Sequence, residues 1–225
     1  MENIKEYVFD FVEGRVNAKD FIGELEKDPS IIEWLQSVVP EGKQMQISVI
    51  VDPEDIYHMY GVKNVPYDVS YMVWKYSVCG GPRGSLSHQL NVHGVISELM
   101  GEIFPNEPLK PDSTLHEKFC FMLDTCPSYI GGSEVEQSGI LDEIMGSVPK
   151  ELSKTAAKKW AREQFKQRFH IQGRKHPYWI QEPEWPIYQG EPMEYVRTER
   201  TCVEYQTHVF RDPKTGTERK VFDAH

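Results

Sequence analysis

His116 and Cys120 stand four residues apart in a stretch that we expect to be helical. Residues at that spacing share one face of a helix, and metal sites use it. A structural zinc site needs four converging ligands, and although Cys126 follows closely, no fourth ligand can be named. We therefore expect no metal site and no cofactor, with His116 in the first turns of the helix and Cys120 as a small core residue.

A cysteine nucleophile with a histidine base is the second chemistry that these residue types allow. Cys126 precedes Pro127 at a predicted helix end, where the negative end of the helix dipole raises the pKa of a thiol instead of lowering it. Cys79, beside Gly80, is better placed but has no identifiable base. An enzyme with its cleft between helices and sheet, using Cys79 or a histidine with a carboxylate, stays an alternative. Its histidine candidates are His88, His93 and His116.

Other catalytic motifs are missing from the sequence. It contains no GxSxG nucleophile elbow, no P-loop, no GxGxxG and no HExxH. Glu182 and Glu184 flank Pro183 and could pair as an acid and a base, but two carboxylates in a Pro-rich surface loop are more often solvated. We predict no catalytic residue from these patterns.

The net charge of −10 over 225 residues is unevenly distributed. Residues 1–150 hold 24 acidic against 11 basic residues, and residues 151–225 hold 11 against 14. An acidic surface opposes nucleic acids and anionic membranes and favours basic partners. The sequence has no long apolar run and no signal-peptide pattern at its start, so we expect a cytoplasmic protein with reduced cysteines and no membrane contact.

Helical periodicity dominates the first two-thirds of the chain. It predicts three short helices within residues 4–40, the second capped by Asn17 and the third starting at Asp28 and Pro29. Residues 44–51 alternate like a strand, and residues 52–66 have the composition of a loop. Another loop is expected at 128–138. The remaining predicted helices cover residues 66–76, 86–104, 113–126, 139–145 and 154–169.

The last of these helices is strongly basic, with Glu163 as its single acid. Such a face could bind nucleic acid or an acidic partner. Because the whole molecule is acidic, we expect a solvated outer face and no nucleic-acid binding. Its basic residues are Lys154, Lys158, Lys159, Arg162, Lys166 and Arg168.

Beyond residue 186 the apolar period changes from that of a helix to that of a strand. Strands are predicted at 193–197, 202–210 and 217–222, with a turn in which Pro213 sets φ and Gly216 supplies a positive φ. A sheet of three antiparallel strands needs a cover for its apolar face. The face expected from the alternation of the second strand is Val203, Tyr205, Thr207 and Val209.

Residues 176–186 connect the two patterns and are rich in tryptophan and proline. We expect Trp179, Trp185, Pro183 and Pro186 to form a structural joint that covers the sheet. The predicted fold is α+β, with a mostly helical N-terminal part (1–175) packed against a small C-terminal antiparallel sheet of about three strands (176–225). The two parts are expected to form one compact domain overall.

The tail also resembles a module of known proteins. The sequence WIQEPEWP at 179–186, GEPMEYV at 190–196, the strand 205–210, Asp212-Pro213 and Gly216 are similar to a C-terminal module of uncharacterised bacterial proteins. Some of those proteins resemble immunity proteins of polymorphic toxin systems. The resemblance covers about the last fifty residues. It implies a cytoplasmic bacterial binding protein and carries over no catalytic residue.

We interpret the chain as a non-enzymatic, acidic binding protein, of which an immunity protein that neutralises a basic toxin domain is one form. Charge attraction would speed association and make it sensitive to salt. A structural subunit is a further alternative, which a large exposed aromatic patch at 67–76 would favour. The sequence leaves the oligomeric state open. The acidic residues expected to bind the partner are Glu24, Glu26, Asp28, Asp52, Glu54, Asp55, Glu134 and Glu136.

Overall fold

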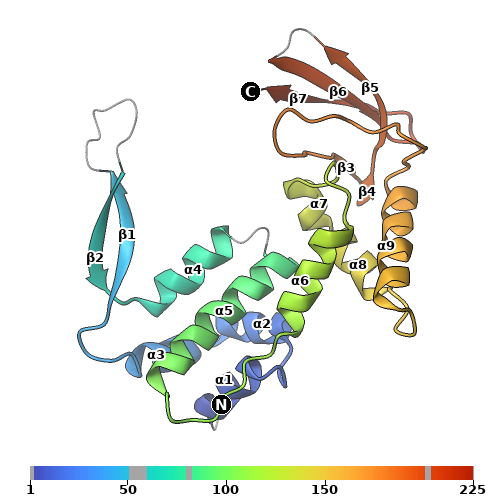
Figure 1. Ribbon diagram of the computed structural model, residues 1–225. Helices are drawn as coiled ribbons and strands as arrows, with labels where there is room; N and C mark the ends of the chain where they lie inside the picture. Colours follow the sequence, from blue (N-terminus) through green and yellow to red (C-terminus); the bar gives the residue numbers. More distant parts are fainter. Residues whose placement is uncertain (1–2, 51–59, 80–82, 201–203, 225) are drawn as a thin grey trace. The chain divides into compact units, whose positions relative to one another are not determined.

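The computed structural model describes residues 3–50, 60–79, 83–200 and 204–224, and it shows an α+β fold (Figure 1). The predicted class is confirmed: helices make up most of the first two-thirds, and a three-stranded antiparallel sheet lies near the C-terminus. None of the described helices is both long and apolar enough to cross a bilayer.

The chain divides into two compact units. Unit 1 consists of Met1–Gly80 and Gln89–Asp112, and unit 2 of Gly81–His88 and Ser113–His225. Each unit is described by itself below. The division of the chain at residue 175 stays a prediction.

Unit 1 begins with α1 (Ile4–Val12), α2 (Ala18–Lys27) and α3 (Pro29–Ser37). The two predicted N-caps are confirmed, because the Asn17 side chain accepts from the Lys19 N–H at 2.8 Å and Asp28 accepts from the Ser30 N–H at 2.9 Å. Each cap satisfies a backbone donor that the first turn of a helix leaves unpaired.

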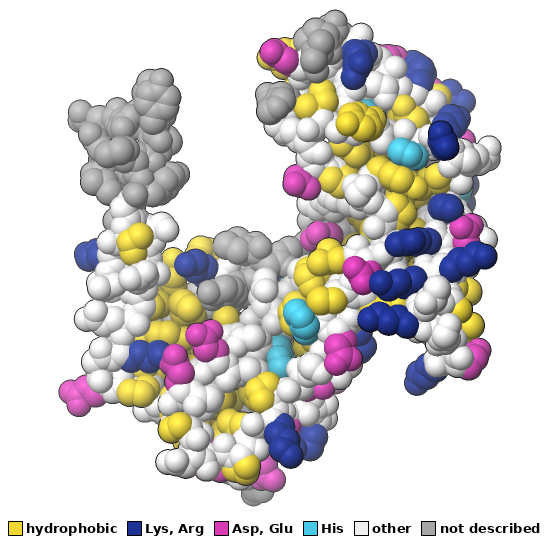
Figure 2. All heavy atoms as spheres, in the orientation of Figure 1, with side chains coloured by type: hydrophobic (Ala, Val, Ile, Leu, Met, Phe, Trp, Pro, Cys, Tyr) yellow, Lys and Arg dark blue, Asp and Glu magenta, His cyan; other side chains and the backbone are white. Residues whose placement is uncertain are grey.

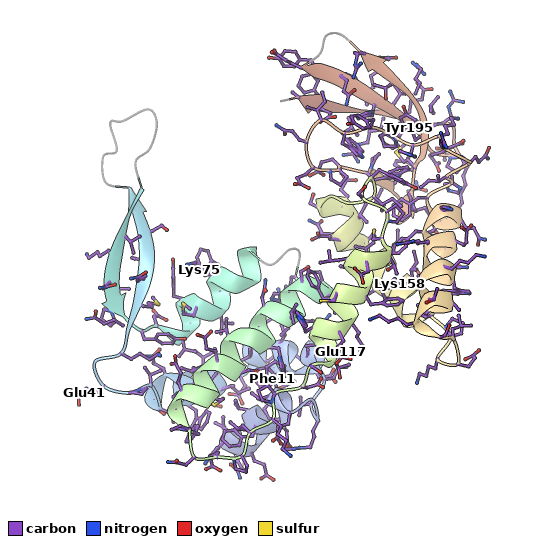
Figure 3. The ribbon with its side chains drawn as sticks, viewed as in Figure 1. Phe11, Glu41, Lys75, Glu117, Lys158 and Tyr195 are labelled. Atoms are coloured by element: carbon purple, nitrogen blue, oxygen red, sulfur yellow. The ribbon has the colours of Figure 1, made fainter. Side chains whose placement is uncertain are left out.

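The core of unit 1 lies between these helices and α5 (Leu86–Ile103). The ring of Phe11, labelled in Figure 3, stacks on Phe21 with centroids 3.8 Å apart and meets the edge of His93. His93 is buried, and its Nε2 lies 3.0 Å from the Val12 carbonyl oxygen. A carbonyl only accepts, so Nε2 carries the proton and satisfies the C-terminal end of α1.

A β-hairpin precedes α4 (Val69–Cys79) in unit 1 (Figure 1). Its strands β1 (Gln44–Ile50) and β2 (Tyr60–Pro66) pair antiparallel, with Ile47 opposite Lys63. The prediction of a loop over 52–66 is therefore wrong for 60–66, while 52–59 lie outside the described residues. Gly61 and Pro66 suggested a loop, but Pro66 occupies the strand end, where a missing N–H is tolerated, and pairing with β1 outweighs the low propensity of Gly61.

Unit 2 contains α6 (Thr114–Thr125), α7 (Ser133–Ser138), α8 (Ile140–Gly146) and α9 (Lys154–Arg168). The prediction of a loop over 128–138 is wrong for α7. A helix of six residues is too short to show apolar periodicity, and only Val135 in it is buried. Ser153 caps α9, accepting from the Ala156 N–H.

The tail of unit 2 forms two sheets. The short strands β3 (Ile187–Tyr188) and β4 (Glu191–Pro192) pair with each other. The larger sheet has the order β5-β6-β7, from β5 (Glu194–Arg200), β6 (Tyr205–Arg211) and β7 (Glu218–Ala224), all antiparallel. A bulge between Tyr195 and Arg197 shifts the register of β5.

The face of this sheet that packs against the core differs from the expected one. Trp179 and Trp185 contact the face that carries His208 and Phe210. Tyr205 lies on the other face and is 43% exposed, while Val203 lies outside the described residues. On the expected face Val209 is buried, so the expectation holds there and fails at Tyr205. The face toward the tryptophans includes the buried polar residues Gln206 and His208, which apolar alternation does not mark and whose hydrogen bonds are satisfied within unit 2.

Candidate functional site

An open groove of about 900 Å³ lies in unit 1 between α3, the hairpin and the start of α4. Figure 2 shows hydrophobic side chains at the base of the hairpin, where this groove lies. Pockets of this size, apolar with a few polar groups, are the usual places where proteins hold ligands or anchoring side chains. Its apolar lining includes Ile32, Met45, Ile47, Val65 and Tyr71.

The wall of the groove between α3 and α4 is fixed by one amide side chain. Gln36 Nε2 donates to the Tyr67 carbonyl at 3.0 Å, and Gln36 Oε1 accepts from the Val69 N–H at 2.8 Å. Asp68 accepts from the Tyr71 N–H at 2.9 Å and so caps α4. These contacts hold the polypeptide that leaves β2 against the exposed side of α3.

Among the described residues, two carboxylates, Glu33 and Asp68, line the groove and no lysine or arginine does, although Lys63 lies directly opposite Ile47 on the same face of the hairpin. The nearby Lys43 is neutralised, because its ammonium pairs with Glu102 and lies 5.0 Å from the centre of the Tyr67 ring. Lys75, labelled in Figure 3, lies on α4 outside the lining. The groove therefore presents apolar surface with negative charge.

The two units differ in net charge. Unit 1 has 18 acidic and 8 basic residues, a net −10, whereas unit 2 has 17 of each and is neutral. The whole net charge of the chain thus belongs to the unit that contains the groove. An opposite charge on a partner would be attracted to this unit in particular.

Aromatic side chains adjoin the groove. Tyr71 lines it and lies 5.8 Å, centroid to centroid, from Trp74, which is 59% exposed. Exposed tryptophan and tyrosine side chains are enriched among the residues that dominate the energy of protein interfaces. These two belong to the stretch 67–76 whose aromatics the sequence singled out.

The structure assigns other tasks to some of the acidic residues expected to bind a partner in unit 1. Glu24 forms an exposed ion pair with Lys27, with Nζ and Oε1 3.4 Å apart. Glu26 is exposed on α2. Asp28 caps α3, and its hydrogen bonds from Ser30 lower the pKa of the carboxyl. The remaining three, Asp52, Glu54 and Asp55, lie outside the described residues.

The two expected binding residues in unit 2 are partly occupied within the unit. Glu134 accepts two guanidinium N–H groups of Arg219 and the Ile187 N–H, and the contact with Arg219 lowers its pKa. Burial raises the pKa of Glu136, and the nearby Glu184 adds to that rise. Glu134 therefore connects α7 to the tail of unit 2 and is not available in full to a partner.

The predicted tryptophan and proline joint packs against the segment that connects α6 to α7. The Trp185 N–H donates to the Gly131 carbonyl at 2.9 Å, and Trp179 Nε1 donates to the Tyr129 carbonyl at 3.0 Å. A Cβ at Gly131 would lie 2.8 Å from Pro183 Cγ, closer than atoms pack, so this approach requires glycine. Trp185 and Pro186 are buried, and the joint thus belongs to the core of unit 2.

A buried hydrogen-bond chain in the same unit was not predicted. His208 Nε2 lies 3.2 Å from Asp223 Oδ2, and its Nδ1 lies 2.9 Å from Thr198 Oγ1, which in turn lies 2.7 Å from the Tyr195 hydroxyl. An ionised Asp223 only accepts, so Nε2 carries the proton and Nδ1 accepts from Thr198. Tyr195 on β5, labelled in Figure 3, is the last residue of this series of hydrogen bonds.

Asp223 is the centre of that network. Its carboxylate also accepts from Gln206 Nε2 at 2.7 Å and from the N–H groups of Ile180 and Gln181. Burial by itself would raise the pKa of Asp223, but these hydrogen bonds lower it. The pairing of the two strands could have indicated this contact, because Gln206 and Asp223 are direct partners across β6 and β7.

Among the described side chains, the cysteines and histidines considered for catalysis do not converge on a cleft. Burial raises the pKa of the Cys126 thiol to about 12, so the direction expected from its helix end is found but the cause is different. His88 is buried, and its Nδ1 accepts from the Gly84 N–H. His116 Nε2 lies 3.4 Å from Cys120 Sγ on the exposed side of α6. The side chain of Cys79 lies outside those described.

Among the described residues, no group of three or more histidine, cysteine or acidic side chains is arranged to hold a metal ion. Comparisons with protein-family models, curated proteins and solved structures find no match to this chain. The chemistry of the site therefore has to be argued from its own residues.

Proposed function

We propose that this protein is a non-enzymatic binding protein that holds a basic protein partner on unit 1, with an apolar anchor of the partner in the groove. The proposal rests on one observation. The open groove, whose lining includes Glu33 and Asp68, belongs to the unit that has all of the net negative charge. Apolar burial supplies affinity, and complementary charge supplies a fast and selective encounter.

The resemblance of the tail suggests a bacterial immunity protein as one form of this function, with a basic toxin domain as the partner and the cytoplasm as the setting. Unit 1 would contribute the partner surface, since a basic domain is attracted to its −10 charge and not to the neutral unit 2. Tyr71 and Trp74 would add aromatic contact area beside the groove.

An enzyme has less support from the same residues. The His208–Asp223 pair has the spacing of a catalytic dyad, but the His208 side chain is completely enclosed and no substrate could reach it. The His116–Cys120 pair is accessible, but it lies on an open helix surface that provides no enclosed site for a transition state.

Site-specific photo-crosslinking tests the proposal. A photoreactive amino acid is placed at Ile47, which lines the groove, and in a matched variant at Val62, which is 67% exposed on the opposite face of the same hairpin. Both variants are irradiated in the native lysate, and crosslinked proteins are identified by mass spectrometry. We expect a basic partner to be captured from Ile47 and not from Val62.

Salt and charge variants then test the electrostatic part. Raising the ionic strength from about 50 to about 500 mM should slow association with the captured partner severalfold. Glu33→Gln and Asp68→Asn should slow it as well, and asparagine keeps the cap of α4. Glu151→Gln, at an exposed position of the neutral unit 2, is the control. Equal capture from both hairpin positions, or binding indifferent to salt and to both groove variants, would refute the proposal.

A further inference from the structure

His116 and Cys120 form an accessible pair that the proposed function does not use. Both side chains are exposed on α6, and Nε2 and Sγ lie 3.4 Å apart. Three other histidines, His88, His93 and His208, are buried and bond to backbone, hydroxyl or carboxylate groups. A thiol beside an imidazole offers a soft and a borderline ligand at one place.

The separation of the two atoms matches chelation of zinc. A tetrahedral ion with Zn–N of about 2.05 Å and Zn–S of about 2.3 Å holds the two donor atoms ~3.6 Å apart. The observed 3.4 Å is within a few tenths of an ångström of that value. The pair can therefore take the ion with a small rotation of either side chain, since both side chains are exposed.

One chain supplies only half of a closed site. Structural zinc is four-coordinate, and no third ligand joins the pair among the described residues. A second copy of α6 would bring another imidazole and another thiol. The resulting Cys2His2 set is neutral, because two thiolates balance the charge of Zn²⁺ and their protons pass to the solvent.

The surroundings of the pair suit a second copy. Phe119 and Leu123 continue the same stripe of α6, at positions three and seven residues beyond His116, and Leu123 is 61% exposed. Two copies meeting at this stripe would bury Leu123. Unit 2, to which α6 belongs, has no net charge, so two copies of this unit do not repel each other through net charge.

We propose that His116 and Cys120 form a half-site for Zn²⁺ that joins two copies of this chain through their α6 helices. Each copy contributes Nε2 and Sγ, and the metal stabilises the dimer. The complex contains one ion for two chains.

The test uses the full chain with Cys79→Ser and Cys202→Ser, kept reduced, so that Cys120 and the half-buried Cys126 are the remaining thiols. Co²⁺ reports thiolate coordination and tetrahedral geometry by its absorption, and Zn²⁺ then displaces it. Sedimentation gives the mass at each metal ratio. We expect saturation at one ion per two chains, with a mass twice that of the metal-free protein that returns on addition of a chelator.

The matched control keeps the ligands and changes their spacing. His116→Ala combined with Lys118→His puts the imidazole two residues from Cys120, where the side chains do not face each other. The variant should lose more than about tenfold in Zn²⁺ affinity, since even the loss of a hydrogen-bond partner of a metal ligand costs that much. Cys120→Ser should abolish the thiolate absorption. Tight binding by the spacing variant, doubling of mass in Cys120→Ser, or metal binding by the parent chain without doubling would overturn the proposal.

Discussion

His208 is held neutral by its surroundings. Burial lowers its pKa, and the hydrogen bond and charge of Asp223 offset that only in part. Its side chain is fully enclosed, with Trp179 against its ring at a centroid distance of 4.4 Å. Both ring nitrogens are engaged, so a second proton would have to displace the hydrogen bond that Nδ1 accepts from Thr198.

A pH dependence of stability follows from that environment. The unfolded chain takes up the His208 proton near pH ~6.5 while the folded chain does so only at lower pH. The free energy of unfolding should therefore be greatest above that value and fall as the pH drops below it, by at most about 1.4 kcal/mol per pH unit for one proton. Urea unfolding between about pH 7.5 and about pH 5.5 measures the slope.

His208→Gln is the matched variant for that measurement. Burial also lowers the pKa of His88, but His88 is present in both proteins, so the difference in slope isolates His208. Glutamine has no proton to gain in this range, and the variant should lose less stability on acidification than the parent chain. Identical slopes would show that the network around Asp223 does not control the response to acid.

Trp185 is a central side chain in the core of unit 2. It is 1% exposed, its Nε1 donates to the Met193 carbonyl at 2.8 Å, and Phe169 and Phe210 meet its ring edge-on. Trp185→Ala should lower the free energy of unfolding by about 3–5 kcal/mol, because it leaves a large cavity. Tyr178→Ala, at a side chain that is 78% exposed, should change it by less than about 0.5 kcal/mol. A loss below about 1 kcal/mol at Trp185 would contradict its place in the core.

Helices with a local signal were predictable as elements, and those without one were not. Asn17, Asp28 and Ser153 each precede a helix and bond its first turn, as their sequence context indicated. The helix α7 and the strand β2 lack such signals. The short α7 shows no periodicity, and β2 exists through its pairing with β1, a contact that no local window contains.

The candidate groove could not be predicted for the same reason. Its walls come from α3, both strands of the hairpin and α4, so it depends on the pairing that was missed. The predicted acidic residues were chosen for charge alone, and several of them cap helices or form ion pairs. Glu33 and Asp68 differ from them only through the fold, which brings them to one hollow.

Gln36 connects α3 to the start of α4. Its amide bonds the chain on both sides of Asp68, and Gln36→Leu would leave the Val69 N–H and the Tyr67 carbonyl without those partners. The loss should be about 1–3 kcal/mol, and it should be local to the start of α4. Hydrogen exchange of the peptide covering 67–75 should accelerate strongly. Glu33→Gln, on the same helix, should leave exchange unchanged, and equal protection in both variants would remove Gln36 from this role.

For the whole molecule, the separation of charge between the units matters more than its total. Unit 1 carries −10 and repels itself, whereas unit 2 balances 17 acidic against 17 basic residues. Figure 2 shows lysine and arginine side chains gathered over α9, and Lys158 on that helix pairs with Asp124 of α6 at 2.6 Å. Arg168 and Arg219 likewise pair with Glu191 and Glu134.

Salt should therefore act in opposite directions on the two units. Raising the ionic strength from about 50 to about 500 mM shortens the range of charge interactions to a few ångströms, which relieves the repulsion within unit 1 and weakens the exposed ion pairs of unit 2, each worth only about 0–1 kcal/mol. Hydrogen exchange followed by mass spectrometry resolves the units in one sample. Peptides of α1–α3 should gain protection with salt, and peptides of α9 and β5–β7 should gain none or lose some. An equal gain in both units would mean that the salt response is a general solvent effect and that the charge of unit 1 is not concentrated enough to govern its stability or to attract a basic partner.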